Sequence, residues 1–252
     1  MMLLERGYSL VEMSLALVVI GLLASAGWMA LKPSVELTEQ LKQQQFLNNV
    51  QEKIVLFAQN NTRLPCPDVT GDGWEDGCSA NDDNVGALPT ATLGLNEQGA
   101  FFRSLLYGVY RGSGSLDLTQ LAERTGDNPG DAGYQTITDL IFALDQLTGA
   151  SIETGQIYVT GDGIDTGVIN CTSNRVTNVA IALAAPGGRS MNGDSNLFDS
   201  VNASLNQDGT STTPCFASPT QMKNASYDDQ VTVISFNELK GKLVNVNNSM
   251  AN

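Results

Sequence analysis

The sequence predicts an α+β fold. We expect a long N-terminal α-helix, membrane-embedded in its first half, to pack on a globular head with an antiparallel β-sheet. Residues 13–31 carry no charge, and 19 helical residues nearly cross a hydrocarbon core of about 30 Å. Residues 34–61 repeat apolar side chains at steps of three and four, which indicates an amphipathic helix. After residue 61, short apolar runs alternate with Gly, Asp and Asn, as in a small sheet.

Composition excludes several functions. The chain has 13 basic and 27 acidic residues, for a net charge of −14, so we expect no nucleic-acid partner. It has no histidine, which excludes Ser-His-Asp or Cys-His catalysis and His-ligated zinc. The GDSN stretch at 193–196 therefore offers Ser195 no histidine base. The sequence predicts a protein that is not an enzyme.

The N-terminal apolar run allows three interpretations. A secretory signal peptide would be cut after the A-x-A triplet at 24–26, an ordinary anchor would stay uncut, and a leader peptide would be cut between Gly7 and Tyr8. Glu12 distinguishes them. A lone carboxylate costs about 2.5–3.5 kcal/mol at the centre of a membrane helix and gives a signal peptide no advantage.

The stretch RGYSLVEM at 6–13 resembles the cleavage and methylation signal of type IV pilins and type II secretion pseudopilins. That resemblance implies that prepilin peptidase cuts after Gly7 and that the new N-terminal amine, on Tyr8, is methylated. It also implies that Glu12 pairs with the N-terminal ammonium of a neighbouring subunit, since two buried opposite charges are tolerable together. The family usually has Phe where this chain has Tyr8.

The predicted organisation is a leader at 1–7, a transmembrane and filament-core helix at 8–31, an amphipathic helix at 32–60 and a pilin-like head at 61–252. We expect Pro33 to kink or break the helix locally. Strands are predicted at 105–110, 156–159, 178–185 and 231–236, and helices at 137–149 and, more weakly, 116–124. The apolar stripe of the second helical segment comprises Leu37, Leu41, Leu47, Val50, Ile54 and Phe57.

Four cysteines, an even number in a chain with an export signal, predict two disulfides. Three pairings are possible, and four buried free thiols are the alternative. We favour the nearest-neighbour pairing, Cys66–Cys78 and Cys171–Cys215. The second of these resembles the C-terminal disulfide that encloses a variable loop in pilins.

Residues 68–79 match the start of an EF-hand-type calcium loop. Its ligands would be Asp68, Thr70, Asp72, the Trp74 carbonyl and Asp76, with Gly73 at the sixth position. Ser79 replaces the bidentate Glu at the twelfth, so Glu75, Asp82 or Asp83 would have to complete the shell.

The alternative to calcium at this loop is a set of Asp-Gly turns held by a disulfide, with no ion. A weaker copy of the pattern, at 159–167, lacks the first ligand and is interpreted as a turn. Adjacent Asp228 and Asp229 are interpreted as a turn that leads into a strand, because neighbouring strand residues point to opposite faces.

The resemblance implies a minor subunit of a type IV pilus or of a type II secretion-like pseudopilus. Its partners would be other pilin or pseudopilin subunits, prepilin peptidase, the membrane and the inner-membrane assembly platform. Its location would be the inner membrane, crossed once with the head in the periplasm, and then the filament and the cell surface. The alternative function is an adhesin or ligand-binding head on a pilin stem. No cofactor is expected besides possible Ca²⁺.

Overall fold

The computed structural model describes residues 10–76, 78, 84–95, 105–126, 135–149, 155–160, 171–172, 174–188, 196–205, 214–224 and 226–250, with backbone alone for 24–40 and 245–250. The elements are α1 (Leu10–Asn61), β1 (Val85–Ala87), β2 (Leu106–Val109), η2 (Gly114–Leu116), α2 (Ile137–Gly149), β3 (Tyr158–Thr160), β4 (Arg175–Val176), β5 (Ile181–Ala185), η3 (Ser200–Ser204), β6 (Cys215–Ala217), β7 (Gln230–Ile234) and α3 (Phe236–Met250). The chain divides into two compact units, Met1–Phe46 and Leu47–Asn252, which are described separately below.

The N-terminal part of α1 corrects the predicted fold class. Across the described residues, we find no helix with the length and apolar character needed to cross a membrane. In the N-terminal apolar run, side chains are described for residues 10–23, which span about 21 Å of a hydrocarbon core of about 30 Å. The predicted pilin-like arrangement, with the first half of a long helix in a membrane, is therefore wrong. So are the transmembrane assignment and the single-pass inner-membrane location.

The backbone of α1 is helical through Pro33, so the local break that we considered at this proline is not present. In the second unit, its last turns bury a stripe made of Leu47, Val50, Ile54 and Ala58. The predicted stripe is thus confirmed at Leu47, Val50 and Ile54. It is wrong at Leu41, which is exposed.

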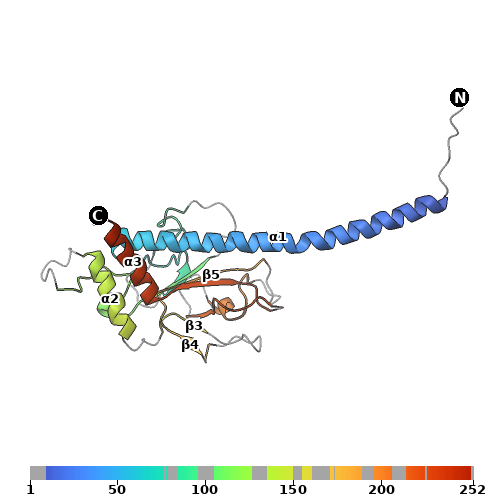
Figure 1. The fold of residues 1–252 in the computed structure, drawn as a ribbon. Helices are drawn as coiled ribbons and strands as arrows, with labels where there is room; N and C mark the ends of the chain where they lie inside the picture. The colour runs from blue at the N-terminus through green and yellow to red at the C-terminus, as the bar shows by residue number, and fades with distance from the viewer. Residues whose placement is uncertain are drawn as a thin grey trace. The chain divides into compact units, whose positions relative to one another are not determined.

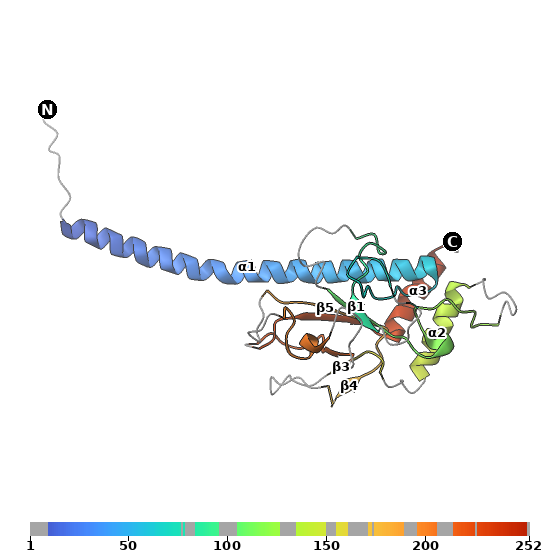
Figure 2. The same cartoon turned by 180° about the vertical axis from the view of Figure 1, so that it is seen from behind.

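The larger sheet has the strand order β1-β2-β5-β7, and every neighbouring pair in it is antiparallel. β5 is central and fully buried, as expected for the apolar run IALAA. The end of α1 is tied to this sheet, because Gln51 Nε2 donates a hydrogen bond to Thr232 Oγ1 at 2.8 Å. Both α2 and α3 bury apolar residues, and they lie side by side at one end of the sheet (Figures 1 and 2).

A second sheet, ordered β4-β3-β6, departs from the prediction. β3 pairs with β6 in parallel, with Tyr158 opposite Cys215, so the strands are not all antiparallel. The predicted helix at 116–124 is also wrong, because only a short 3₁₀ turn, η2, ends there. The Asp117 side chain accepts hydrogen bonds from the backbone N–H and the hydroxyl of Thr119, and these local bonds compete with a helix.

Candidate functional site

The first candidate site is the N-terminal turns of α1. Every described side chain from 10 to 23 is exposed, including Glu12. Gly7 and Tyr8, the predicted cleavage and methylation residues, lie outside the described residues. The large apolar side chains exposed in this segment are Leu10, Val11, Met13, Leu15, Leu17, Val18, Val19, Ile20, Leu22 and Leu23. At 100° per residue these positions surround the helix, so its surface is apolar on all sides.

The predicted calcium loop brings Asp68, Asp72 and Asp76 together, with one carboxylate oxygen from each within 4.8 Å of the others. Asp68 is buried, and its carboxylate is held by the loop itself. Its Oδ1 accepts hydrogen bonds from the backbone N–H of Thr70 and Gly71, at 3.2 and 2.7 Å. Its Oδ2 accepts one from Gly73 N–H at 2.7 Å. These three hydrogen bonds fold the chain from Asp68 to Gly73 into a tight turn around the Asp68 carboxylate.

The other carboxylates of this loop also bind loop donors. Asp76 Oδ2 accepts the Thr70 hydroxyl at 2.6 Å, and Asp72 Oδ1 accepts the Trp74 backbone N–H at 2.8 Å. Gly73 has φ +88°, a conformation that favours glycine. This geometry fits either interpretation from the sequence, a calcium loop or a turn without an ion, and calcium binding at this loop stays a prediction.

Glu75 is engaged elsewhere. It forms a two-point ion pair with Arg63, with N–O distances of 2.6 and 2.8 Å, and its Oε2 accepts the Cys66 N–H at 3.0 Å. Burial raises the pKa of Glu75, but the Arg63 and Cys66 hydrogen bonds outweigh it and leave the pKa below its usual value. Both carboxylate oxygens of Glu75 therefore already accept hydrogen bonds, and a part for Glu75 in a calcium shell stays a prediction. Ser79, Asp82 and Asp83 lie outside the described residues.

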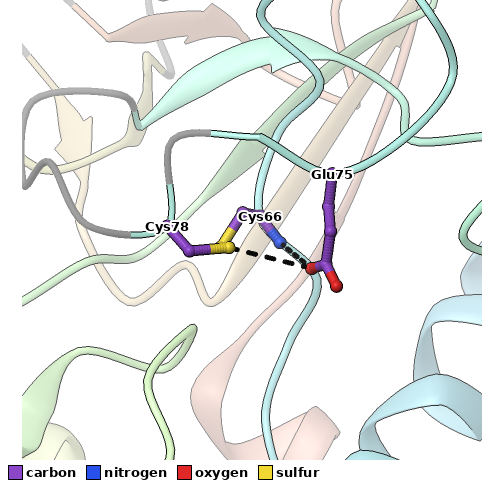
Figure 3. A group of neighbouring side chains, drawn as sticks. All are labelled: Cys66, Glu75 and Cys78. Carbon is purple, nitrogen blue, oxygen red and sulfur yellow. Dashed lines mark hydrogen bonds between the residues drawn. A yellow bond between two sulfur atoms is a disulfide. The ribbon is translucent and has the colours of Figure 1, made fainter.

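The first disulfide joins Cys66 to Cys78 beside Glu75 (Figure 3). The Cys78 sulfur lies 3.9 Å from Glu75 Oε2, but a disulfide sulfur has no hydrogen to donate. Because both sulfurs are in the disulfide, this trio of Cys66, Glu75 and Cys78 is not a thiolate metal site. Its role is to fix the start of the Asp68 loop.

The second disulfide joins Cys171 to Cys215, so the structure has the nearest-neighbour pairing that the sequence favoured. The Tyr158 hydroxyl donates a hydrogen bond to the Cys171 carbonyl at 3.1 Å, and Arg175 Nε donates to the same oxygen at 2.7 Å. The guanidinium of Arg175 also lies 4.9 Å from the centre of the Tyr158 ring. The disulfide is thus anchored on β3 and β4.

A second acidic group was missed by the sequence interpretation. Asp199, Asp228 and Asp229 are all buried, and one carboxylate oxygen from each lies within 4.8 Å of the others. Burial raises the pKa of Asp229 to about 6 and also raises the pKa of Asp228, whose carboxyl faces Asp199. An Asp pair just before an apolar strand is the signal that could have found this group.

Comparisons with protein-family models, with curated proteins and with solved structures find no match to this chain.

Proposed function

We propose that this chain is a subunit of a filament of the type IV pilus or type II secretion pseudopilus class, cut between Gly7 and Tyr8 and assembled through its N-terminal helix. The observation that carries the proposal is the helical segment 10–23, which is apolar on all sides and exposed along its described length. The RGYSLVEM motif at its start supports the same class.

The exposed apolar surface gives a physical reason to assemble. Leu10 is 88% exposed, and Leu22 and Leu23 are 64% and 68% exposed. Fully burying one such side chain contributes about 1.5–3 kcal/mol. Association costs about 4–15 kcal/mol. Packing ten of these side chains against the same helix of other subunits, even partly, gives a free energy of the size needed.

Glu12 has a specific part in this proposal. It lies two residues into α1, next to Val11 and Met13, in the surface that the other subunits would cover. A carboxylate in such an interface requires a cation. The N-terminal ammonium exposed by cleavage after Gly7 is a cation of the right kind, supplied by the neighbouring subunit.

The test is Glu12→Ala, with Glu52→Ala as the matched control on an exposed position of the same helix. We expect Glu12→Ala to be cleaved normally but to enter filaments at least tenfold less than wild type, because its subunits lack the pairing charge. Glu52→Ala should enter normally. Mass spectrometry of the N-terminus and quantification of sheared filaments measure the two steps separately.

Two results would contradict the proposal. A mature N-terminus at Gly27 in place of Tyr8 would show a signal peptide. If Glu12→Ala entered filaments at the wild-type level, the proposed pairing of Glu12 with the N-terminal ammonium of a neighbouring subunit would be contradicted. Scoring filaments, secretion and adhesion separately after deletion of the gene distinguishes an assembly subunit from the alternative, an adhesin on a filament stem, which would affect adhesion alone.

A further inference from the structure

The disulfide between Cys66 and Cys78 lies directly beside a carboxylate (Figure 3). Glu75 Oε2 is 3.9 Å from the Cys78 sulfur and accepts the Cys66 backbone N–H at 3.0 Å, so one oxygen faces both cysteines. The Glu75 side chain is 20% exposed, which limits the screening of its charge by solvent. Burial raises the pKa of Glu75, but hydrogen bonds from Arg63 and Cys66 outweigh it, so the carboxylate is ionised at neutral pH.

The two sulfurs differ in access. Cys66 is fully buried, whereas Cys78 is partly exposed. An attacking thiolate therefore bonds to the Cys78 sulfur, while the S–S bond breaks and its electron pair leaves on Cys66 as a thiolate. A second thiolate of the reagent then attacks the reagent's sulfur in this mixed disulfide. Cys78 leaves as a thiolate, the reagent is oxidised to its own disulfide, and negative charge has developed at both cysteines beside Glu75.

Two cations also lie near the disulfide, and each has a carboxylate partner. Arg63 forms a two-point ion pair with Glu75, at 2.6 and 2.8 Å. Arg111 Nη2 donates a hydrogen bond to the Cys78 carbonyl at 2.9 Å and lies 3.3 Å from Asp117 Oδ2. In both pairs the guanidinium contacts carboxylate and main-chain oxygens, and it is the Glu75 carboxylate that lies against the sulfur.

We propose that the Glu75 carboxylate protects the Cys66–Cys78 disulfide from reduction by thiols. It repels the thiolate that attacks Cys78, and it disfavours the thiolate that leaves at Cys66, because a nearby negative charge makes both anions less stable. Arg63 holds the carboxylate in place and moderates its charge. Since this disulfide closes the segment that contains Asp68, its protection also keeps that loop closed.

The experiment measures thiol exchange at each disulfide of the folded, full-length protein. Cysteamine is compared with 2-mercaptoethanesulfonate, because the thiolate of the first has no net charge and that of the second is doubly negative. Alkylation at successive times, followed by peptide mass spectrometry, gives separate rate constants for Cys66–Cys78 and for Cys171–Cys215. Dividing each rate constant by the thiolate fraction of the reagent leaves the effect of charge.

We expect Glu75→Gln to accelerate the reaction of Cys66–Cys78 with 2-mercaptoethanesulfonate by at least about threefold, and the reaction with cysteamine by less. Arg63→Gln is the matched variant. It removes the same ion pair but leaves the negative charge, so the reaction with 2-mercaptoethanesulfonate should become slower than in wild type. The rate constants of Cys171–Cys215 should not change in either variant, which makes the second disulfide an internal control.

Opposite changes in the two variants separate the effect of charge from a loosening of the loop. A loosened loop would expose the sulfurs to both reagents, so both variants would react faster with both, and the proposal would be overturned. A wild-type rate in Glu75→Gln would also overturn it. If Glu75→Gln does not fold, Arg63→Gln still decides: a reaction with 2-mercaptoethanesulfonate as fast as in wild type, or faster, contradicts the protective role of Glu75.

Discussion

The carboxyl group of Asp229 is buried, and burial raises its pKa from 3.8 to about 6. The folded state therefore holds a proton at Asp229 at pH values where the unfolded chain has released it. The stability that this proton contributes is fully present below pH 3.8. It is lost as the pH rises through about 6. Asp228 shifts in the same direction.

The raised pKa of Asp229 predicts that the folded state becomes less stable as the pH rises. In EDTA, we expect the free energy of unfolding of wild type, relative to Asp229→Asn, to fall by about 2 kcal/mol between pH 4.5 and 7.5. Urea unfolding of both proteins at several pH values measures the difference. Glu75 and Asp139 have lowered pKa values, so they act below this window. If the free energies of unfolding of the two proteins changed in parallel with pH, a raised pKa at Asp229 would be contradicted.

At the same scale, the sequence predicted one acidic group and missed another. Asp68, Asp72 and Asp76 lie within eight residues of each other, so a tight turn is enough to bring them together. Asp199 is far from Asp228 in sequence, and no local pattern connects them. The side chains of Asp228 and Asp229 were expected to point to opposite faces, because neighbouring residues of a strand do so. That expectation does not apply, since β7 begins only at Gln230 and both residues precede it.

Among the elements, β2 of the larger sheet and β6 of the smaller sheet approach each other closely at Gly108. A Cβ on Gly108 of β2 would lie 2.7 Å from Cε2 of the Phe216 ring on β6, and 3.2 Å from Ile157. Phe216 and Gly108 are both buried. Glycine is needed at this position because the ring occupies the space of a side chain.

We therefore expect Gly108→Ala to lower the free energy of unfolding by about 1–3 kcal/mol, through overpacking. Gly241→Ala is the matched control. Gly241 lies within α3 with no atom near its added Cβ, so alanine should raise stability by about 0.5–1 kcal/mol. Urea unfolding followed by circular dichroism measures both. Equal stability of Gly108→Ala and wild type would contradict the close packing of the sheets.

Where the sequence has a strong local pattern, the observed element agrees with the predicted one. α2 occupies 137–149 as its periodicity predicts, and the four predicted strand regions overlap β2, β3, β5 and β7. The very short strands β1, β4 and β6 were not predicted, because each has only two or three residues and depends on its neighbours for pairing. The parallel pairing of β3 with β6 is a tertiary choice that no local pattern encodes.

For the whole molecule, the two disulfides constrain unequal lengths of chain. Cys66 and Cys78 are 12 residues apart, whereas Cys171 and Cys215 are 44 apart. A longer closed loop restricts the unfolded chain more. Loop-closure entropy gives about 3 kcal/mol for the shorter link and about 4 kcal/mol for the longer one.

We expect the double variant Cys171→Ala with Cys215→Ala to lose more stability than Cys66→Ala with Cys78→Ala, by about 1 kcal/mol. Paired substitutions avoid leaving a reactive thiol. Chemical unfolding of both variants and wild type under the same non-reducing conditions gives the comparison. The opposite order would show that local contacts, such as Glu75 with Cys66, outweigh loop length.

The link between Cys171 and Cys215 also defines a closed covalent ring. The ring contains β4, η3 and β5, the strand that lies between β2 and β7 in the larger sheet. If the backbone is cut once between Cys171 and Cys215, the disulfide still joins the two resulting fragments, and no piece of the polypeptide is released. The same break outside both rings divides the chain into two covalently independent parts. The central strand of the sheet thus stays attached to its neighbours on both sides after any one cut within the ring.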